Sequence, residues 1–180
     1  MGRDKARLRW QGASLAAREA ALLAAVCEPV VLVGGSGRSP VPGVPVVVDR
    51  RPGEGPLAGL EAALEVAAGA AVLLLACDLP AVDDELIAEL ARCGDDFGAA
   101  GPEARMAVDG EAFQPLCALY SATCAPLVTA ALDRGERSAR SLLRSLRVTR
   151  VEAAGRLVNV NTPEEWERWT AEQRSAREPS

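Results

Sequence analysis

The chain has 180 residues, which suffices for one domain with a full hydrophobic core but not for two of ordinary size. Its formal net charge of −5 argues against a protein that binds a polyanionic duplex, so we expect no nucleic-acid partner. The absence of histidine excludes Ser-His-Asp hydrolysis, imidazole base catalysis and histidine-ligated metal sites. Carboxylates, arginine and backbone amides remain, and they suit phosphoryl and nucleotidyl transfer, where positioning and charge neutralisation dominate.

The cysteine pattern and the lack of long apolar runs predict the compartment. The five cysteines show no Cys-x-x-Cys spacing, and an odd number suits reduced thiols. No charged-then-apolar leader opens the sequence, and no apolar run reaches about 18 residues. We therefore expect a cytoplasmic protein without a membrane segment.

Apolar periodicity predicts alternating helices and buried strands in the first half of the chain. Ser14 is the expected cap of the first helix, and Pro56 stands at a tolerated first-turn position of the second. The expected strands are 29–35, 44–49 and 71–77, and the expected helices are 14–26, 56–69 and 82–93.

The second half of the chain has a less regular pattern. Thr162 is the expected cap of the final helix. Shorter strands are expected at 97–102, 105–110 and 113–121, helices at 123–135 and 138–146, and a last strand, a loop and a helix within 156–173.

This alternation predicts a single Rossmann-like, doubly wound α/β domain with a mostly parallel sheet. We expect the domain to span residues 1–170 and residues 171–180 to form a frayed tail. In such sheets, ligands bind outside the carboxyl ends of the strands. Asp49 and Asp78 both stand at the ends of predicted strands, so they are candidate ligand-binding residues.

Two glycine-rich segments follow predicted strands. Residues 32–40 (LVGGSGRSP) resemble a phosphate-cradling loop, but the prolines that follow argue against an immediate helix, so a flexible loop is favoured. Residues 49–60 (DRRPGEGPLAGL) place Gly53 and Gly55 directly before a helix, where glycine lets the backbone approach a ligand closely. Asp49 could hold a ribose hydroxyl, a base edge or a hydrated metal, although the segment also suits a plain turn and cap.

Asp78 follows the most apolar predicted strand and precedes Pro80. A carboxylate at this place could bind Mg²⁺, which takes few protein ligands and leaves positions for phosphate oxygens. The alternative is an ordinary aspartate that caps the end of a strand.

Amide side chains and a basic stretch complete the set of candidates. Asn159 and Asn161 offer both donors and acceptors, although helix capping by this segment is the simpler account. Gln114 could face a ring system, yet a polar residue ahead of a buried strand is common. The arginines of residues 133–150 could attract a phosphorylated substrate, but a solvated helix face is favoured.

Together and in this order, six segments resemble the molybdenum cofactor guanylyltransferase family within the MobA-like nucleotidyltransferases. The resemblance covers roughly residues 2–169 and implies a Rossmann-like enzyme. Such an enzyme joins the guanylyl part of GTP to the terminal phosphate of molybdenum-bound molybdopterin and releases pyrophosphate. The segments are GRDK (2–5), DRRPGEGPLAGLEAAL (49–64), LLLACDLPAV (73–82), QPLCALY (114–120), GERSARSLL (135–143) and NVNTPEEW (159–166).

The resemblance also implies roles for the matching residues. Lys5 and Asp78 would be catalytic, with Lys5 on the triphosphate and Asp78 holding Mg²⁺ beside the phosphates. Asp49 would help to bind the guanine nucleotide. Gly53, Gly55 and Pro56 would line the nucleotide side, and the residues that would face the acceptor or complete the metal surroundings are Gln114, Asn159 and Asn161.

In this family, the Gly-x-Asp-Lys run is preceded by an apolar strand and a glycine-rich loop. Met1 and Gly2 align with the last two positions of that loop, so we expect the first strand of the fold to be missing from this sequence. Its neighbours would then face each other with unpaired backbone groups, and the affinity for GTP would fall. A start site assigned too late explains the pattern, and an in-frame stop codon just upstream would contradict it.

Two alternatives remain open at this point. A related nucleotidyltransferase could use CTP or another acceptor, because the choice of base depends on the absent loop. A non-catalytic remnant could instead serve as a scaffold, with molybdoenzyme-assembly proteins as partners. The presence of Lys5, Asp49 and Asp78 argues against a scaffold, which has no need of residues suited to a triphosphate.

Overall fold

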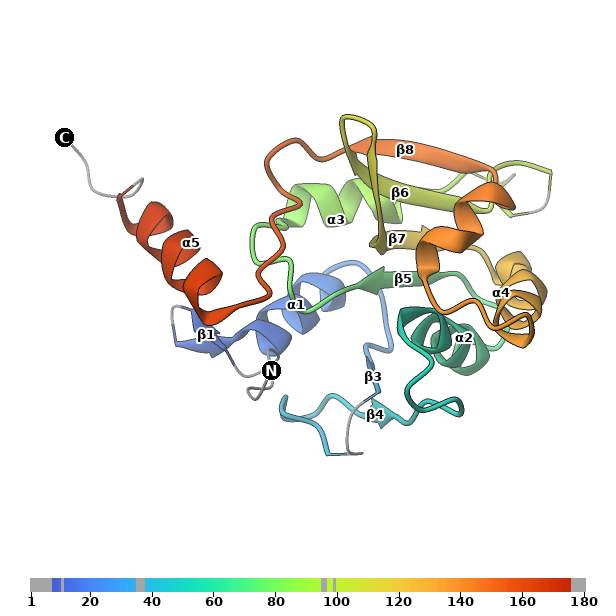
Figure 1. Cartoon of the computed structure of the whole chain (residues 1–180), viewed down its shortest axis with the longest axis horizontal. Coiled ribbons are helices and arrows are strands. Elements are labelled where there is room, and N and C mark those ends of the chain that lie inside the picture. Colours follow the sequence, from blue (N-terminus) through green and yellow to red (C-terminus); the bar gives the residue numbers. More distant parts are fainter. Residues whose placement is uncertain (1–7, 11, 35–37, 95–96, 99, 176–180) are drawn as a thin grey trace.

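The computed structural model describes residues 8–10, 12–34, 38–94, 97–98 and 100–175. A four-stranded sheet with helices on both faces makes up most of this structure, and the last helix, α5 (Pro163–Ser175), extends away from it (Figure 1). Within the described ranges, no helix is both long enough and apolar enough to cross a lipid bilayer.

The central sheet contains β5 (Val72–Leu75), β6 (Ala104–Asp109), β7 (Ala112–Tyr120) and β8 (Val148–Glu152), in the spatial order β5-β7-β6-β8. β7 is antiparallel to both of its neighbours, whereas β6 and β8 are parallel to each other. Three of the four strands therefore point the same way, and β7 alone among them is reversed. The predicted mostly parallel direction of the sheet is confirmed.

Two short pairs of strands lie outside the central sheet. β3 (Leu32–Val33) and β4 (Val46–Val47) are parallel to each other and form a separate two-stranded sheet. β1 (Arg9–Trp10) and β2 (Ala13–Ser14) form an antiparallel hairpin that the sequence pattern did not predict. β3 and β4 occupy the runs predicted as strands but are much shorter than those runs.

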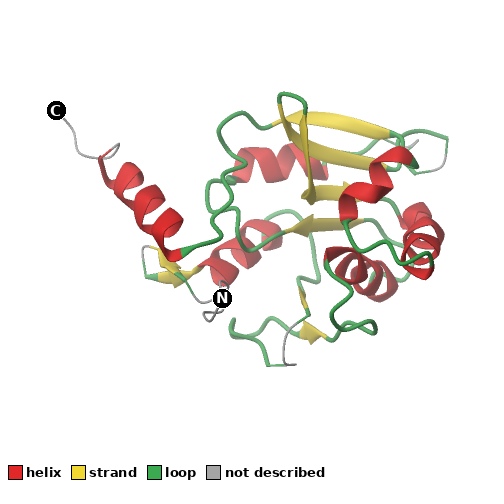
Figure 2. Cartoon of the chain, in the orientation of Figure 1, coloured by secondary structure: helices red, strands yellow, loops and turns green. Residues whose placement is uncertain are grey.

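Helices cover both faces of the central sheet, which confirms the doubly wound arrangement (Figure 2). One face carries α2 (Pro56–Val66), α4 (Ala125–Asp133) and the 3₁₀ helix η3 (Ala139–Arg144). The other carries α3 (Asp84–Ala91) and the end of α1 (Leu15–Ala24). A short 3₁₀ turn, η2 (Ala122–Cys124), leads from β7 into α4.

The side chains of β5 divide between the two hydrophobic cores. Val72 and Leu74 pack into the core beneath α2 and α4, whereas Leu73 and Leu75 pack into the core beneath α3. Because successive side chains of a strand point to opposite faces, a continuous apolar run is required to satisfy both layers. The uninterrupted run VLLL therefore explains why this segment forms a strand that is covered on both sides.

The helix starts agree with the caps predicted from the sequence. The Ser14 hydroxyl accepts a hydrogen bond from the backbone N–H of Ala17 at 3.2 Å. Thr162 and Glu165 form a reciprocal capping box, since the Thr162 hydroxyl accepts from the Glu165 N–H at 3.2 Å and the Glu165 carboxylate accepts from the Thr162 N–H at 3.1 Å. These bonds satisfy amides that a helix end leaves unpaired.

Several expectations for the second half are wrong. The described residues of 97–102 form turns rather than a strand, because Gly98 has a φ of +81° and its N–H donates to Pro102 across a tight loop. The helix expected at 138–146 is the shorter η3. The last strand is β8. Residues 157–161 form no strand, and the N–H of Val160 donates to the carbonyl of Asp78 rather than to a neighbouring strand. α5 continues to Ser175, so the expected tail does not begin at residue 171.

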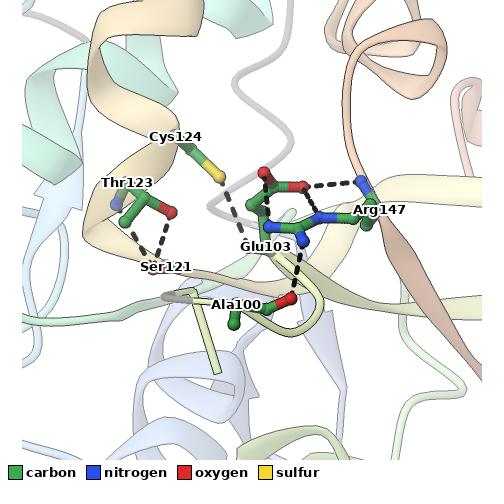
Figure 3. Close-up of polar contacts among 6 residues, drawn as sticks. All are labelled: Ala100, Glu103, Ser121, Thr123, Cys124 and Arg147. Atoms are coloured by element: carbon green, nitrogen blue, oxygen red, sulfur yellow. Dashed lines mark hydrogen bonds and ion pairs between the residues drawn. The ribbon is translucent and has the colours of Figure 1, made fainter. Parts of the chain in front are cut away.

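A polar cluster joins the amino ends of β6 and β8 (Figure 3). The Arg147 guanidinium donates to both oxygens of the Glu103 carboxylate, at 3.1 and 3.3 Å, and the Arg147 N–H adds a third bond at 2.7 Å. These bonds lower the pKa of Glu103 below its usual value. Arg147 also donates to the carbonyl of Ala100, and Cys124 donates to the carbonyl of Glu103. The cluster therefore fixes the amino ends of β6 and β8, at the end of the sheet opposite to their carboxyl ends.

Glu19 is a buried carboxylate on α1, with only 2% of its surface exposed. Arg18 donates to one of its oxygens at 2.8 Å, and the other oxygen has no hydrogen-bond partner among the described residues. Burial raises the pKa of Glu19 from 4.5 to about 7, although the charge and hydrogen bond of Arg18 oppose this. The folded protein therefore favours the protonated form.

We expect Glu19→Gln to stabilise the protein increasingly as the pH rises from 4.5 to 7. Over this interval, the folded state holds a proton that the unfolded state has released, so the free energy of unfolding of the wild type falls. The gain of the variant relative to the wild type should grow by up to about 3 kcal/mol. Urea unfolding below and above this interval measures it. Glu172→Gln, at an exposed position of α5, is the control, and a difference that does not change with pH would contradict the account.

Candidate functional site

Asp78 lies just beyond the carboxyl end of β5 and is half-buried. The next residue, Leu79, is fully buried in the core beneath α3. The carbonyl of Asp78 accepts a hydrogen bond from the N–H of Val160 at 3.0 Å. The backbone at Asp78 is thus held on one side by the core and on the other by the loop that precedes α5.

This loop brings the two predicted asparagines next to Asp78. Asn159 and Asn161 flank Val160, the residue whose N–H bonds to Asp78, and both are exposed. The backbone N–H of Asn161 donates to Glu165 at 2.6 Å, so the capping role predicted for this segment is present. The exposed asparagine side chains still stand beside the end of β5.

Gln114, near the start of β7, joins the same group. Its Nε2 donates to Oδ1 of Asn159 at 3.5 Å. Gln114 also lines a small pocket of about 110 Å³ together with Pro56 at the start of α2 and Arg140 of η3. The structure therefore gathers five of the predicted site residues at one place, namely Pro56, Asp78, Gln114, Asn159 and Asn161.

The proline-glycine segment forms a tight turn into α2. Gly53 and Gly55 have φ angles of +84° and +78°, which glycine adopts readily and other residues do not. Gly55 is the residue that caps α2, and Pro56 is its first residue. The N–H of Leu57 donates to the carbonyl of Arg137 at 3.3 Å, so the start of α2 lies against the basic segment that follows α4.

Asp49 lies at the entrance to this segment. Its Oδ1 accepts a hydrogen bond from the backbone N–H of Arg51 at 2.7 Å, which is the turn-forming role that the sequence also allowed. The Arg51 side chain continues to Glu61 of α2 at 3.0 Å and to Asp133 of α4 at 2.8 Å. The contacts of Asp49 thus belong to a turn that is fixed to two helices.

Two predictions concern residues that the structure describes only in part or not at all. Lys5 lies outside the described residues. The glycine-rich segment 32–40 includes residues 35–37, which also lie outside them, but residues 38–45 form no helix. The prediction that no helix follows this segment directly is confirmed for the described part.

The basic segment after α4 lies closer to the candidate site than the sequence pattern predicted, since that pattern favoured a solvated helix face. The backbone of Arg137 contacts Gly55, and Arg140 lines the pocket with Gln114. The Arg137 side chain remains 61% exposed, at 3.9 Å from Glu54. Its position could not be inferred from periodicity, because the contact depends on how η3 packs beside α2.

The donor atoms of this site are hard oxygens. Within the described residues, no group of three or more cysteine or carboxylate side chains could enclose a metal ion. Asp78 supplies one carboxylate, and the neighbouring asparagines supply amide oxygens. This set suits a cation such as Mg²⁺, which commonly takes one or two carboxylates and completes its shell with water and phosphate oxygens.

Two solved structures illustrate the similarity of this fold to known ones. The chain is similar to the crystal structure of molybdopterin-guanine dinucleotide biosynthesis protein A from Archaeoglobus fulgidus, with a TM-score of 0.75 and 22% identity over 98% of this chain and 93% of that one. It is also similar to 2-C-methyl-D-erythritol 4-phosphate cytidylyltransferase from Thermus thermophilus, with a TM-score of 0.68 and 20% identity over 94% of each chain. At these identities the likeness establishes the fold alone, which is Rossmann-like.

Curated relatives define the family more narrowly. The chain is 39% identical to a probable molybdenum cofactor guanylyltransferase of Opitutus terrae over 93% of this chain and 87% of the relative. It is 40% identical to one of Deinococcus radiodurans, over 90% and 83% of the two chains. The model of the MobA-like NTP transferase domain matches residues 1–151. The chain therefore belongs to the MobA-like NTP transferase family, and it is a nucleotidyltransferase.

We expect Gly55→Ala to cost more stability than Gly53→Ala. Both residues have positive φ angles, but a Cβ at Gly55 would lie 3.0 Å from the carbonyl oxygen of Arg137, whereas a Cβ at Gly53 would meet nothing within 4 Å. Strain alone costs about 1 kcal/mol, and the added clash should bring Gly55→Ala to about 2 kcal/mol or more. Urea unfolding measures both variants, and equal costs would show that the start of α2 is not held against Arg137.

Proposed function

We propose that the chain transfers GMP from GTP to the terminal phosphate of molybdenum-bound molybdopterin and forms the guanine dinucleotide cofactor. The observation that carries the proposal is the 3.0 Å bond between Val160 and Asp78, which holds a carboxylate and two asparagines at one end of a doubly wound sheet. In such sheets this end is the usual place for nucleotides. The proposal is further supported by relatives that are named molybdenum cofactor guanylyltransferases.

The nucleotide lies on the side of the site formed by the start of α2. Gly53, Gly55 and Pro56 present backbone with no bulky side chain, which permits close approach to the nucleotide. Asp49 stands at the entrance to this turn and contributes to binding of the guanine nucleotide. Lys5, which lies outside the described residues, is assigned to the triphosphate, where its charge offsets that of the phosphates.

Asp78 is the residue that would hold Mg²⁺, together with oxygens of the triphosphate. When bound, the ion neutralises charge on the phosphates and orients them for displacement. Asp78 is suited to this because it is half-buried and its backbone is fixed by Val160. Asn161, next to that bond, would complete the surroundings of the ion.

The transfer forms one bond and breaks one. An oxygen of the acceptor phosphate attacks the α-phosphorus of GTP, the bond between that phosphorus and the oxygen bridging to the β-phosphate breaks, and pyrophosphate leaves with the electron pair. Because the acceptor oxygen is already anionic, no base has to remove a proton. A chain without histidine can therefore carry out this reaction, since the work is positioning and charge neutralisation.

The acceptor lies beside Gln114 and Asn159, which are hydrogen-bonded to each other. Their amide groups can donate to and accept from the ring system of a pterin. Arg140 lines the same pocket as Gln114 and brings a positive charge close to the acceptor phosphate.

We place the reaction in the cytoplasm, because all five cysteines are free thiols.

We expect Asp78→Asn to lower magnesium-dependent GMP transfer by about 100-fold or more, since removing one charge-stabilising group commonly has this effect. Glu89→Gln is the control, because the carboxylate of Glu89 is exposed and lies away from the site. The backbone carbonyl of Glu89 accepts from Arg105 near the amino end of β6, which is the opposite end of the sheet. Pyrophosphate release from GTP, with CTP as competitor, measures both activity and choice of base. Full transferase activity of Asp78→Asn would contradict the catalytic role of Asp78, whereas a cellular role that survives loss of activity in this variant would favour a scaffold.

We expect Gln114→Ala to raise the KM for the pterin acceptor about tenfold, corresponding to the loss of roughly one hydrogen bond, and to leave the KM for GTP unchanged. Asn159→Ala should have the same effect, because the two amides are bonded to each other. Gln173→Ala, near the far end of α5, is the matched control. A change in the KM for GTP alone would place Gln114 on the nucleotide side instead.

A further inference from the structure

All three tryptophans of the chain lie in one cluster, although they come from opposite ends of the sequence. Trp10 is on β1, whereas Trp166 and Trp169 are on α5. The ring centroid of Trp10 is 5.1 Å from that of Trp169 and 6.4 Å from that of Trp166, with edge-to-face geometry in both pairs. Aromatic rings attract one another at such separations. The hairpin of β1 and β2 is therefore attached to the last helix by ring contacts.

The cluster lies where α5 leaves the body of the molecule. α5 extends away from the central sheet, and β1 lies beside its first turns (Figure 1). Trp166 and Trp169 are three residues apart, so they share one face of the helix, and their rings stack with centroids 5.4 Å apart. Trp169 is only 6% exposed. The face of α5 that receives Trp10 is thus packed and apolar.

The start of α5 is tied to the candidate site by hydrogen bonds. Trp166 follows Glu165, whose carboxylate accepts from the N–H of Asn161 at 2.6 Å. The preceding residue, Val160, donates to the carbonyl of Asp78 at 3.0 Å. A displacement of the first turn of α5 would therefore pass directly to the bond that joins the asparagine loop to Asp78.

The hairpin is tied to the same place from the other direction. Its second strand leads directly into α1, and the N–H of Leu15 donates to the carbonyl of Leu8 at 2.8 Å. Ala16, the next residue of α1, is fully buried in the cluster that Cys77 packs against. Cys77 is the residue before Asp78. The hairpin therefore rests on the chain segment that carries the candidate metal ligand.

These contacts form a closed set around the asparagine loop. The set runs from Asp78 through Val160 to α5, from α5 through the tryptophans to the hairpin, and from the hairpin through α1 to Cys77 beside Asp78. The loop cannot swing away from Asp78 without breaking one of these contacts. Binding groups need such support, because a site whose surroundings are loose does not hold its geometry.

We propose that Trp10 is a positioning residue of the candidate site. By holding α5 against the hairpin, Trp10 keeps Val160 bonded to Asp78 and keeps Asn161 beside the place assigned to Mg²⁺. Its effect reaches the ion through that bond and not through a contact of its own. The part of the proposal that concerns the ion rests on the proposed function, whereas the link between Trp10 and the bond does not.

Amide hydrogen exchange tests this link without any measurement of turnover. Trp10→Ala removes the ring contacts with α5, so exchange at Val160 should become about tenfold faster. Exchange at Met106, which lies in β6 between two neighbouring strands, should change by less than about twofold. Trp10→Phe keeps an aromatic ring and should restore most of the protection at Val160.

Two further variants make the exchange experiment specific. Phe97→Ala is the matched control, because it removes a half-buried aromatic ring from the turns that precede β6, at the end of the sheet opposite to Asp78. It should leave exchange at Val160 unchanged. Trp166→Ala breaks the same contact from the side of α5 and should also speed exchange at Val160. This variant serves as the test if Trp10→Ala does not fold.

A magnesium titration of GMP transfer tests the consequence for the ion. Trp10→Ala should raise the Mg²⁺ concentration that gives half-maximal activity about tenfold, and Trp10→Phe should restore the wild-type value. The kcat at saturating Mg²⁺ should stay within about twofold of the wild type, because the bound ion draws the loosened loop back to Asp78. A mere loss of folded protein would instead lower kcat and leave the Mg²⁺ requirement unchanged.

Two results would overturn the proposal. Unchanged exchange at Val160 in folded Trp10→Ala and Trp166→Ala would show that the tryptophan cluster does not hold the asparagine loop. Faster exchange with an unchanged Mg²⁺ requirement would show that the loop does not serve the ion. A wild-type protein without any transfer activity would count against the proposed function instead, and exchange at Val160 would still decide whether Trp10 positions the loop.

Discussion

The apolar strand β5 is the element on which the rest of the molecule depends. Its side chains divide between two cores, so the helices on both faces of the sheet are anchored to the same few residues. β5 pairs with β7 along one edge and lines a cavity of about 400 Å³. Its carboxyl end delivers Asp78 to the loop that carries Val160. The packing of both cores, the pairing with β7 and the position of Asp78 therefore all depend on β5.

The candidate site follows from where chain segments end. Asp78 follows a strand, Pro56 begins a helix, and the asparagines lie in a loop that has no ladder of its own. These positions lie in loops or at the ends of regular elements, which is where binding residues are commonly found. Long-range contacts bring them together, since Gln114 and Asn159 are 45 residues apart in the chain.

The sequence predicted those parts of the fold that rest on local patterns. The caps at Ser14 and Thr162 and the apolar run of β5 needed no knowledge of the rest of the chain. β8 was missed because its pairing with β6 decides its structure, and its exposed Arg150 resembled part of a solvated helix. The Arg150 guanidinium in fact lies over the ring of Phe113, 5.3 Å from its centroid, a contact invisible in the linear pattern.

Paramagnetic relaxation by Mn²⁺ in the presence of GTP would test the central claim most directly. Mn²⁺ takes the oxygen ligands that Mg²⁺ takes, and it broadens the resonances of nearby amides. We predict strong broadening of the amides at or beside the bond between Val160 and Asp78, namely those of Asp78, Leu79, Val160 and Asn161. The signals of Glu89 and Arg105, at the opposite end of the sheet, should stay sharp. Broadening centred on any other part of the chain would contradict the proposal that nucleotide and metal bind at the carboxyl end of β5.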